Sequence, residues 1–172
     1  LQNLLEWSRL QMEGATCEPQ TIALRDVTQE SMDILRPIAL EKNIRLTNGI
    51  EDASAFADRD MVQTVIRNLI ANSLKFTPPG GSVEVSSHGD GDRVRVTVSD
   101  TGVGMSDDQV EKIFSLDQNT STTGTSGEKG TGLGLPLCKD MLERNGGRIW
   151  VESKPAEGSR FHFTLPAGTE KE

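Results

Sequence analysis

The sequence has few cysteines, no long apolar run and no surplus of positive charge, and each absence excludes a class of protein. Its two cysteines, Cys17 and Cys138, stand far apart without CxxC or CxxH spacing, which argues against a disulfide framework or a zinc site. No run of about 18 apolar residues is present, so no membrane-spanning segment is predicted. No signal peptide is visible, and reduced thiols in a cytoplasmic location are expected.

The charge balance argues against nucleic acid as a partner. The 172 residues carry a formal net charge of -8, with acidic and basic residues mixed along the chain. Nucleic-acid binding usually needs a basic face. A phosphate ligand remains compatible with this charge, because backbone amides and one or two lysines are enough to hold phosphate in an acidic protein.

The apolar pattern predicts an α+β protein without internal repeats. Helices are predicted over residues 1–13, after a cap at Asp26 or Thr28, and over 59–76, 107–114 and 133–144. Strands are predicted near residues 21–24, 44–47, 53–57, 82–87, 93–98, 148–152 and 160–165. This order, with antiparallel hairpins late in the chain, predicts a two-layer α/β sandwich: a mixed, mostly antiparallel sheet with helices on one face.

The second predicted helix has an apolar stripe that we expect to be buried. The stripe consists of Val27, Ser31, Ile34, Leu35 and Ile38. Pro37 lies inside this helix and is expected to kink it.

Asn68, Asn72 and Lys75 form the first candidate site, on the predicted helix over 59–76. They are spaced i, i+4 and i+7, so they follow one stripe at the border of the apolar face. Amide oxygens are hard ligands suited to Mg²⁺, and an ammonium group suits phosphate oxygens. The alternative is a solvated helix edge with no ligand.

The second candidate site is the turn DTGVG (100–104), directly after a predicted strand. Glycines allow the backbone to approach a ligand closely, and the Asp100 carboxylate could accept the amino group of adenine. Asp107 stands where the dinucleotide fingerprint G-x-G-x-x-G needs glycine, so a dinucleotide fold is excluded. The alternative is that Asp100 merely caps the turn.

The third candidate site is GTGLGL (130–135), where a long polar loop over 115–132 leads into a helix. Such a turn can hold phosphate, because the free amides and the helix dipole both favour anions. The P-loop pattern is absent, since Lys129 is followed by glycine rather than serine or threonine. A flexible loop with no site beneath it is the alternative.

Taken together, the order and spacing of these motifs resemble the histidine kinase catalytic domain, a family shared with DNA gyrase and mismatch-repair ATPases. The matching segments are RNLIANSLKFTPPGG (67–81), DTGVGM (100–105), IF (113–114), GEKGTGLGLPLCKDML (127–142) and EGSRFHFTLP (157–166). The resemblance covers roughly residues 20–167. LLEWSRLQMEG (4–14) also resembles the end of the second dimerisation helix that precedes this domain in the family.

This resemblance implies an ATP site and its Mg²⁺ ion. Asn72 would bind Mg²⁺, Lys75 the phosphates and Asp100 the adenine amino group, with Thr164 close to the same adenine edge. The remaining implied contacts are Gly102 and Gly104 at the adenine pocket, Phe114 as an anchor of the loop, and Lys129, Gly130, Thr131, Gly132, Leu133, Gly134 and Leu135 around the phosphates.

Asn68 separates the possible activities. Hydrolysing members of the superfamily carry a glutamate four residues before the metal-binding asparagine, where it activates water. An amide cannot take that proton, so the resemblance implies transfer of the γ-phosphoryl group to a histidine instead. His88 and His162 lack the context of an acceptor and are expected to be structural, so the histidine would lie on a separate domain.

The resemblance also implies an organisation and partners. Residues 1–14 would end a dimerisation helix, residues 15–167 would form the ATP-binding domain, and residues 168–172 a disordered tail. The chain would be an excised part of a homodimeric bacterial kinase, cytoplasmic here, that phosphorylates the receiver domain of a response regulator. Three alternatives remain: a hydrolysing ATPase, a non-catalytic nucleotide-sensing or docking module, and a serine kinase of the anti-sigma type.

Overall fold

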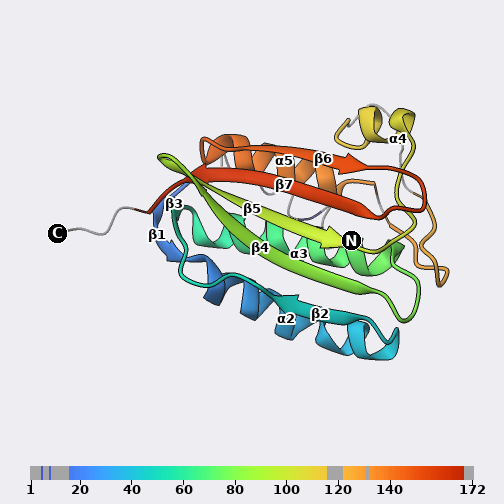
Figure 1. The fold of residues 1–172 in the computed structure, drawn as a ribbon. Helices are drawn as coiled ribbons and strands as arrows, with labels where there is room; N and C mark the ends of the chain where they lie inside the picture. The colour runs from blue at the N-terminus through green and yellow to red at the C-terminus, as the bar shows by residue number, and fades with distance from the viewer. Residues whose placement is uncertain (1–4, 6–7, 9–15, 116–121, 131, 169–172) are drawn as a thin grey trace.

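The computed structural model describes Leu5, Ser8 and residues 16–115, 122–130 and 132–168 (Figure 1). Leu5 and Ser8 are helical, and the other residues of the helix predicted over 1–13 lie outside this description, as does the tail from residue 169. Within the described residues, no helix is both long and apolar enough to cross a membrane.

One layer of the fold is a five-stranded sheet with strand order β2-β4-β5-β7-β6. The strands are β2 (Arg45–Asn48), β4 (Ser82–Asp90), β5 (Arg93–Asp100), β6 (Arg148–Ser153) and β7 (Ser159–Pro166). Neighbours run antiparallel, except that β2 runs parallel to β4. A separate two-stranded sheet pairs β1 (Gln20–Ala23) with β3 (Ser54–Ala57).

Helices form the second layer, on one face of the sheet (Figure 1). They are α2 (Leu24–Glu41), α3 (Arg59–Phe76) and α5 (Gly134–Arg144), while the short α4 (Asp107–Lys112) lies beside one end of the sheet. Alternate strand residues are buried beneath the helices, among them Val83, Val96 and Phe163, each 0% exposed. The predicted fold class, an α+β sandwich with helices on one face, is confirmed.

Helix α3 spans the predicted residues 59–76, because its start and its apolar face are both clear in the sequence. The Asp58 side chain accepts a hydrogen bond from the Met61 backbone amide at 3.1 Å, which caps the helix. Val65, Ile66 and Leu69 are fully buried between the sheet and the neighbouring helices. Proline at 78 and 79 follows the end of the helix.

Helix α2 differs from its prediction. It begins at Leu24, before the expected caps at Asp26 or Thr28. Ala23 occupies the N-cap position and has no side chain that could accept a capping hydrogen bond. The prediction of a buried stripe was wrong at Ile34 and Ile38, which are 57% and 49% exposed. Ser31 is buried as predicted, and Thr28, which the predicted stripe did not include, is buried as well. A polar residue thus occupies a position on the inner face that a hydrophobicity pattern assigns to the surface.

Candidate functional site

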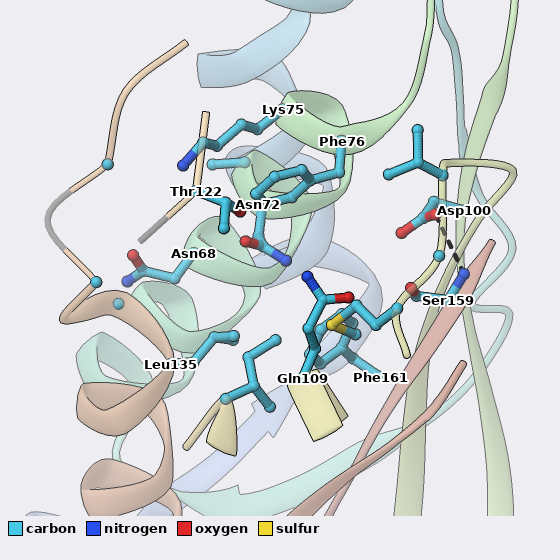
Figure 2. A pocket seen from close by; sticks show the side chains of 18 of the residues that line it. Asn68, Asn72, Lys75, Phe76, Asp100, Gln109, Thr122, Leu135, Ser159 and Phe161 are labelled. Carbon is cyan, nitrogen blue, oxygen red and sulfur yellow. Dashed lines mark hydrogen bonds between the residues drawn. The ribbon is translucent and has the colours of Figure 1, made fainter. Parts of the chain in front are cut away.

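A cavity of about 540 Å³ opens between α3, the turn after β5, α4 and the start of α5. Its volume suits a small organic ligand. Figure 2 shows side chains of α3 on one side of it, and Asp100 and Ser159 on the other. The lining consists of Asn68, Ala71, Asn72, Lys75, Phe76, Asp100, Val103, Gly104, Met105, Asp108, Gln109, Lys112, Ile113, Thr122, Thr123, Gly130, Gly132, Gly134, Leu135, Ser159 and Phe161.

The polar stripe of α3 forms one wall. The Asn68 amide donates a hydrogen bond to the Thr64 carbonyl at 2.8 Å, which fixes the side chain and leaves its oxygen available. Asn72 lines the cavity and makes no side-chain hydrogen bond with another described residue. Burial lowers the pKa of Lys75, against the opposing effect of Glu128. The stripe therefore faces a cavity rather than open solvent.

Asp100 lies at the opposite wall, at the end of β5. Its Oδ1 accepts a hydrogen bond from the backbone amide of Gly102 at 2.8 Å. It also accepts one from the backbone amide of Ser159 at 3.2 Å, the dashed line in Figure 2. Burial raises the pKa of Asp100, and these two amides together with the nearby Ser73 hydroxyl partly offset that rise. Both hydrogen bonds reach Oδ1, so Oδ2 remains for a donor in the cavity.

The glycines beside Asp100 are required by close backbone contacts. Gly104 has a φ of +69°, and a Cβ there would lie 1.9 Å from the Lys154 carbonyl oxygen. Gly158, with a φ of +73°, would place a Cβ 2.1 Å from the carbonyl oxygen of Asp100. The turn between β6 and β7 is thus packed directly against the Asp100 turn, which fixes the position of the carboxylate.

The glycine-rich turn closes a further side. Gly130, Gly132, Gly134 and Leu135 line the cavity, and α5 begins there. Pro136 has no N–H, so the first turn of α5 offers the backbone amides of Gly134 and Leu135. Thr131 lies outside the described residues. Lys129 is exposed and, like Leu133 and the buried Gly102, is not part of the lining.

Phe114 and Thr164 are two further predicted site residues that do not line the cavity. Phe114 contacts the ring of Phe161 edge-on, with 6.5 Å between ring centroids. Phe161 lines the cavity, so Phe114 supports a lining residue without reaching the cavity itself. The prediction that Thr164 lies near Asp100 was wrong, because Thr164 pairs with Arg95 whereas Asp100 pairs with Ser159. Five residues of strand separate the two positions, about 16 Å. Ser159 occupies the place expected for Thr164.

No motif in the sequence indicated that α4 forms a wall of the cavity. Asp108, Gln109 and Lys112 line the cavity, and Lys112 pairs with Asp108 at 3.1 Å. Ser106 and Gln109 form a capping box at the start of this helix. That pattern identifies a helix start and carries no information about a ligand.

Neither histidine lies at the cavity. His162 is 8% exposed, stacks on Trp150 at 5.3 Å between centroids, and has its Nδ1 2.8 Å from the Thr97 hydroxyl. Burial lowers its pKa, although Glu152 acts in the opposite direction. His88 is exposed on β4.

The donor set around the cavity limits how a metal ion could bind. Among the described residues, no group of three or more histidine, cysteine or acidic side chains could hold a metal. The amide oxygen of Asn72 fits Mg²⁺, which commonly takes one or two protein ligands and completes its shell with phosphate oxygens and water. The residues present therefore fit a metal that is held mainly by a phosphate-bearing ligand.

Comparison with known proteins identifies the family of the chain. Residues 57–169 match the family described as histidine kinase-, DNA gyrase B-, and HSP90-like ATPase. The adaptive-response sensory kinase SasA of Synechocystis sp. is 34% identical over 166 residues, covering 92% of this chain and 40% of the relative. The chain thus spans well under half of the curated relatives it matches.

Solved structures of two kinases are similar in fold. The catalytic domain of histidine kinase ThkA is 30% identical, with a TM-score of 0.75 over 87% of this chain and 95% of that domain. ThkA in complex with the response regulator protein TrrA is 25% identical, with a TM-score of 0.75 over 97% of this chain and 46% of the ThkA chain. Full-length ShkA in complex with AMPPNP is 26% identical, with a TM-score of 0.81 over 98% of this chain and 35% of the ShkA chain.

Proposed function

The chain belongs to the family of histidine kinase-, DNA gyrase B- and HSP90-like ATPases and is the ATP-binding catalytic domain of a sensor histidine kinase, and we propose on this premise how its cavity holds ATP. The observation that carries the proposal is the composition of the cavity beside α3. The cavity brings the amide and lysine stripe of α3, the Asp100 carboxylate and the glycine-rich turn together from three distant parts of the sequence.

Asp100 binds the adenine in this proposal. Its Oδ2 accepts the exocyclic amino group, while Oδ1 stays bonded to the backbone amides of Gly102 and Ser159. Guanine carries a carbonyl at the corresponding position and would be repelled by the carboxylate. The apolar side chains of Val103, Met105 and Phe161 supply the flat contact for the base.

The phosphates lie toward Lys75 and the glycine-rich turn. Lys75 and the Gly134 and Leu135 amides neutralise the negative charge of the phosphates. Asn72 would contribute an amide oxygen to a Mg²⁺ ion, which would supply further charge neutralisation. Asn68 stands beside these groups without the basicity needed to activate water.

The reaction that fits this site is in-line phosphoryl transfer. A histidine imidazole nitrogen of a separate domain forms a bond to the γ-phosphorus, the bond to the β–γ bridging oxygen breaks, and ADP leaves. We propose that the phosphoryl group then passes to a response regulator, as the complex of ThkA with TrrA suggests for a relative. A cytoplasmic position in a homodimeric kinase belongs to the same proposal.

Titration calorimetry of the chain with ATP and with GTP, each with and without Mg²⁺, tests this proposal. We expect binding of ATP but not GTP, tightened by Mg²⁺. Addition of a histidine-bearing dimerisation domain should then yield phosphohistidine. A folded chain that bound neither nucleotide would favour a docking module instead, whereas steady phosphate release from the chain alone would favour a hydrolysing ATPase.

A further inference from the structure

Lys42 is a buried cation that the proposed chemistry does not use. It follows the last residue of α2, and its side chain is 7% exposed. A lysine ammonium has three N–H donors, and burial without partners would be costly. All three donors of Lys42 have an acceptor within hydrogen-bond distance, so this ammonium is fully satisfied inside the protein.

Two of these acceptors belong to the last turn of α3. The Lys42 ammonium donates to the carbonyl of Leu74 at 2.8 Å and to the carbonyl of Lys75 at 3.0 Å. The last carbonyls of a helix lack partners within the helix and carry its negative dipole end, so a cation there is favourable. Lys42 therefore fixes the turn from which Lys75 projects into the cavity.

The third acceptor belongs to the loop that leads into the glycine-rich turn. The Lys42 ammonium lies 2.7 Å from Oε2 of Glu128, and Oε1 of Glu128 accepts from the Ser126 backbone amide at 2.7 Å. Burial alone would raise the pKa of Glu128, but the hydrogen bonds from Lys42 and the backbone outweigh it and lower the pKa. The carboxylate is thus held in its charged form.

The loop is packed on α3 at the same place. The Thr125 backbone amide donates to the Lys75 carbonyl at 3.0 Å, and the Gly124 amide donates to the Glu128 carbonyl at 2.8 Å. A Cβ on Gly124 would lie 2.6 Å from Cγ of Lys75, so only glycine allows this contact. The segment Gly124–Glu128 forms a compact turn, which we call the anchor turn, seated on the end of α3.

The position of the anchor turn connects it to the ligand. Thr122 and Thr123, just before it, line the cavity, and so does Gly130, two residues after it. The anchor turn itself does not line the cavity. Fixing Glu128 therefore determines where both flanks of the loop stand relative to Lys75.

We propose that Lys42 and Glu128 are positioning residues for the triphosphate of ATP. The ion pair fastens the anchor turn to α3 and so holds Lys75 and the glycine-rich turn at the spacing that the phosphates need. Neither side chain touches the nucleotide. This inference rests on the proposed function, because it assumes that phosphates lie between Lys75 and Gly130.

Glu128→Gln tests the inference with little risk to folding, since Lys42 keeps both helix carbonyls. We expect the affinity for ATP to fall about tenfold, with the affinity for adenosine unchanged. In the assembled kinase, KM for ATP should rise with less change in kcat. Glu143→Gln is the matched control, because Glu143 forms an exposed ion pair with Lys139 on α5 at 4.0 Å, and it should leave both affinities unchanged.

A double-mutant cycle with Lys42→Met tests whether the Lys42–Glu128 ion pair causes the loss of ATP affinity. If the two residues act through one contact, the double variant should lose no more ATP affinity than Lys42→Met alone. Additive losses would overturn the inference, as would unchanged ATP affinity in Glu128→Gln or an equal loss of adenosine. Failure of the wild-type chain to bind ATP would instead refute the proposed function, so the two failures are distinguishable.

Discussion

Asp100 is half-buried and carries a raised pKa, a combination that costs stability when the group ionises. The backbone amides of Gly102 and Ser159 and the Ser73 hydroxyl offset only part of the cost of burying the charge. A carboxylate kept in such surroundings is explained by a ligand that donates to it. The proposed recognition of adenine therefore accounts for a carboxylate that lowers the stability of the fold.

Asp100→Asn should separate the two effects. The unfolded carboxyl titrates near 3.8, and the folded pKa is higher, so the folded state binds more protons in the window between them. The wild-type free energy of unfolding therefore falls, relative to the variant, as pH rises above about 4, until the pH has passed the folded pKa. Urea denaturation across this range measures the difference, with the exposed Asp92→Asn as control. A difference that does not change with pH would contradict the pKa assignment.

The same variant should bind ATP at least about a hundredfold more weakly, because one acceptor in the buried site becomes a donor. Calorimetry measures this loss. ATP affinity equal to that of the wild type would remove Asp100 from adenine recognition.

Asn72→Ala addresses the other end of the ligand. We expect the affinity for ATP to lose its dependence on Mg²⁺, because an amide oxygen ligand is removed. At saturating Mg²⁺, the affinity for ATP should fall about ten- to a hundredfold. The affinity for adenosine should remain. Titrations with both ligands measure the two values, and an equal loss of adenosine and ATP would show that Asn72 supports the whole pocket instead.

Helices α2 and α3 show what the sequence could and could not predict. For α3, the Asp58 cap, the continuous apolar face and the following prolines all agree, so the residue bounds were predicted correctly. For α2, Thr28 lies on the buried face and Ile34 and Ile38 are exposed, so a pattern of hydrophobicity was misleading at these positions. The wall formed by α4 could not be predicted, since its position depends on tertiary packing alone.

The corrected face of α2 gives a matched pair of substitutions. Leu35→Ala should lower the free energy of unfolding by about 2–4 kcal/mol, because Leu35 is 7% exposed in the core. Ile34→Ala, at a position 57% exposed, should change it by less than about 0.5 kcal/mol. Chemical denaturation measures both. Equal losses of stability in the two variants would support the stripe predicted from the sequence, in which Ile34 is buried like Leu35.

At the scale of the whole molecule, the core and the cavity share one helix. Val65 and Leu69 of α3 are fully buried against the sheet, while Asn68 and Asn72 on the same helix line the cavity. A ligand held by α3 thus acts on the folded state as a whole. Sequence motifs indicated which segments meet there, but the pairing of Asp100 with Ser159 required the strand register.

Ligand binding should accordingly raise the stability of the entire domain. At free ATP one hundred times the dissociation constant, the gain is about 2.7 kcal/mol. For a domain of this size, that corresponds to an increase in Tm of about 5–10 °C. Scanning calorimetry with and without ATP and Mg²⁺ measures the shift, and Asp100→Asn should show none. A shift of equal size with GTP would contradict adenine selectivity.

The parallel pairing of β2 with β4 has a consequence for the time course of folding. Arg45 pairs with Ser82, and the chain between them contains β3 and all of α3. The hairpin of β4 and β5 closes through a short local turn, whereas the parallel pair closes a long loop whose entropy must be overcome first. Because α3 is the crossover of that loop, the wall that carries Asn68, Asn72 and Lys75 should become fixed late, in the same slow step that completes the sheet.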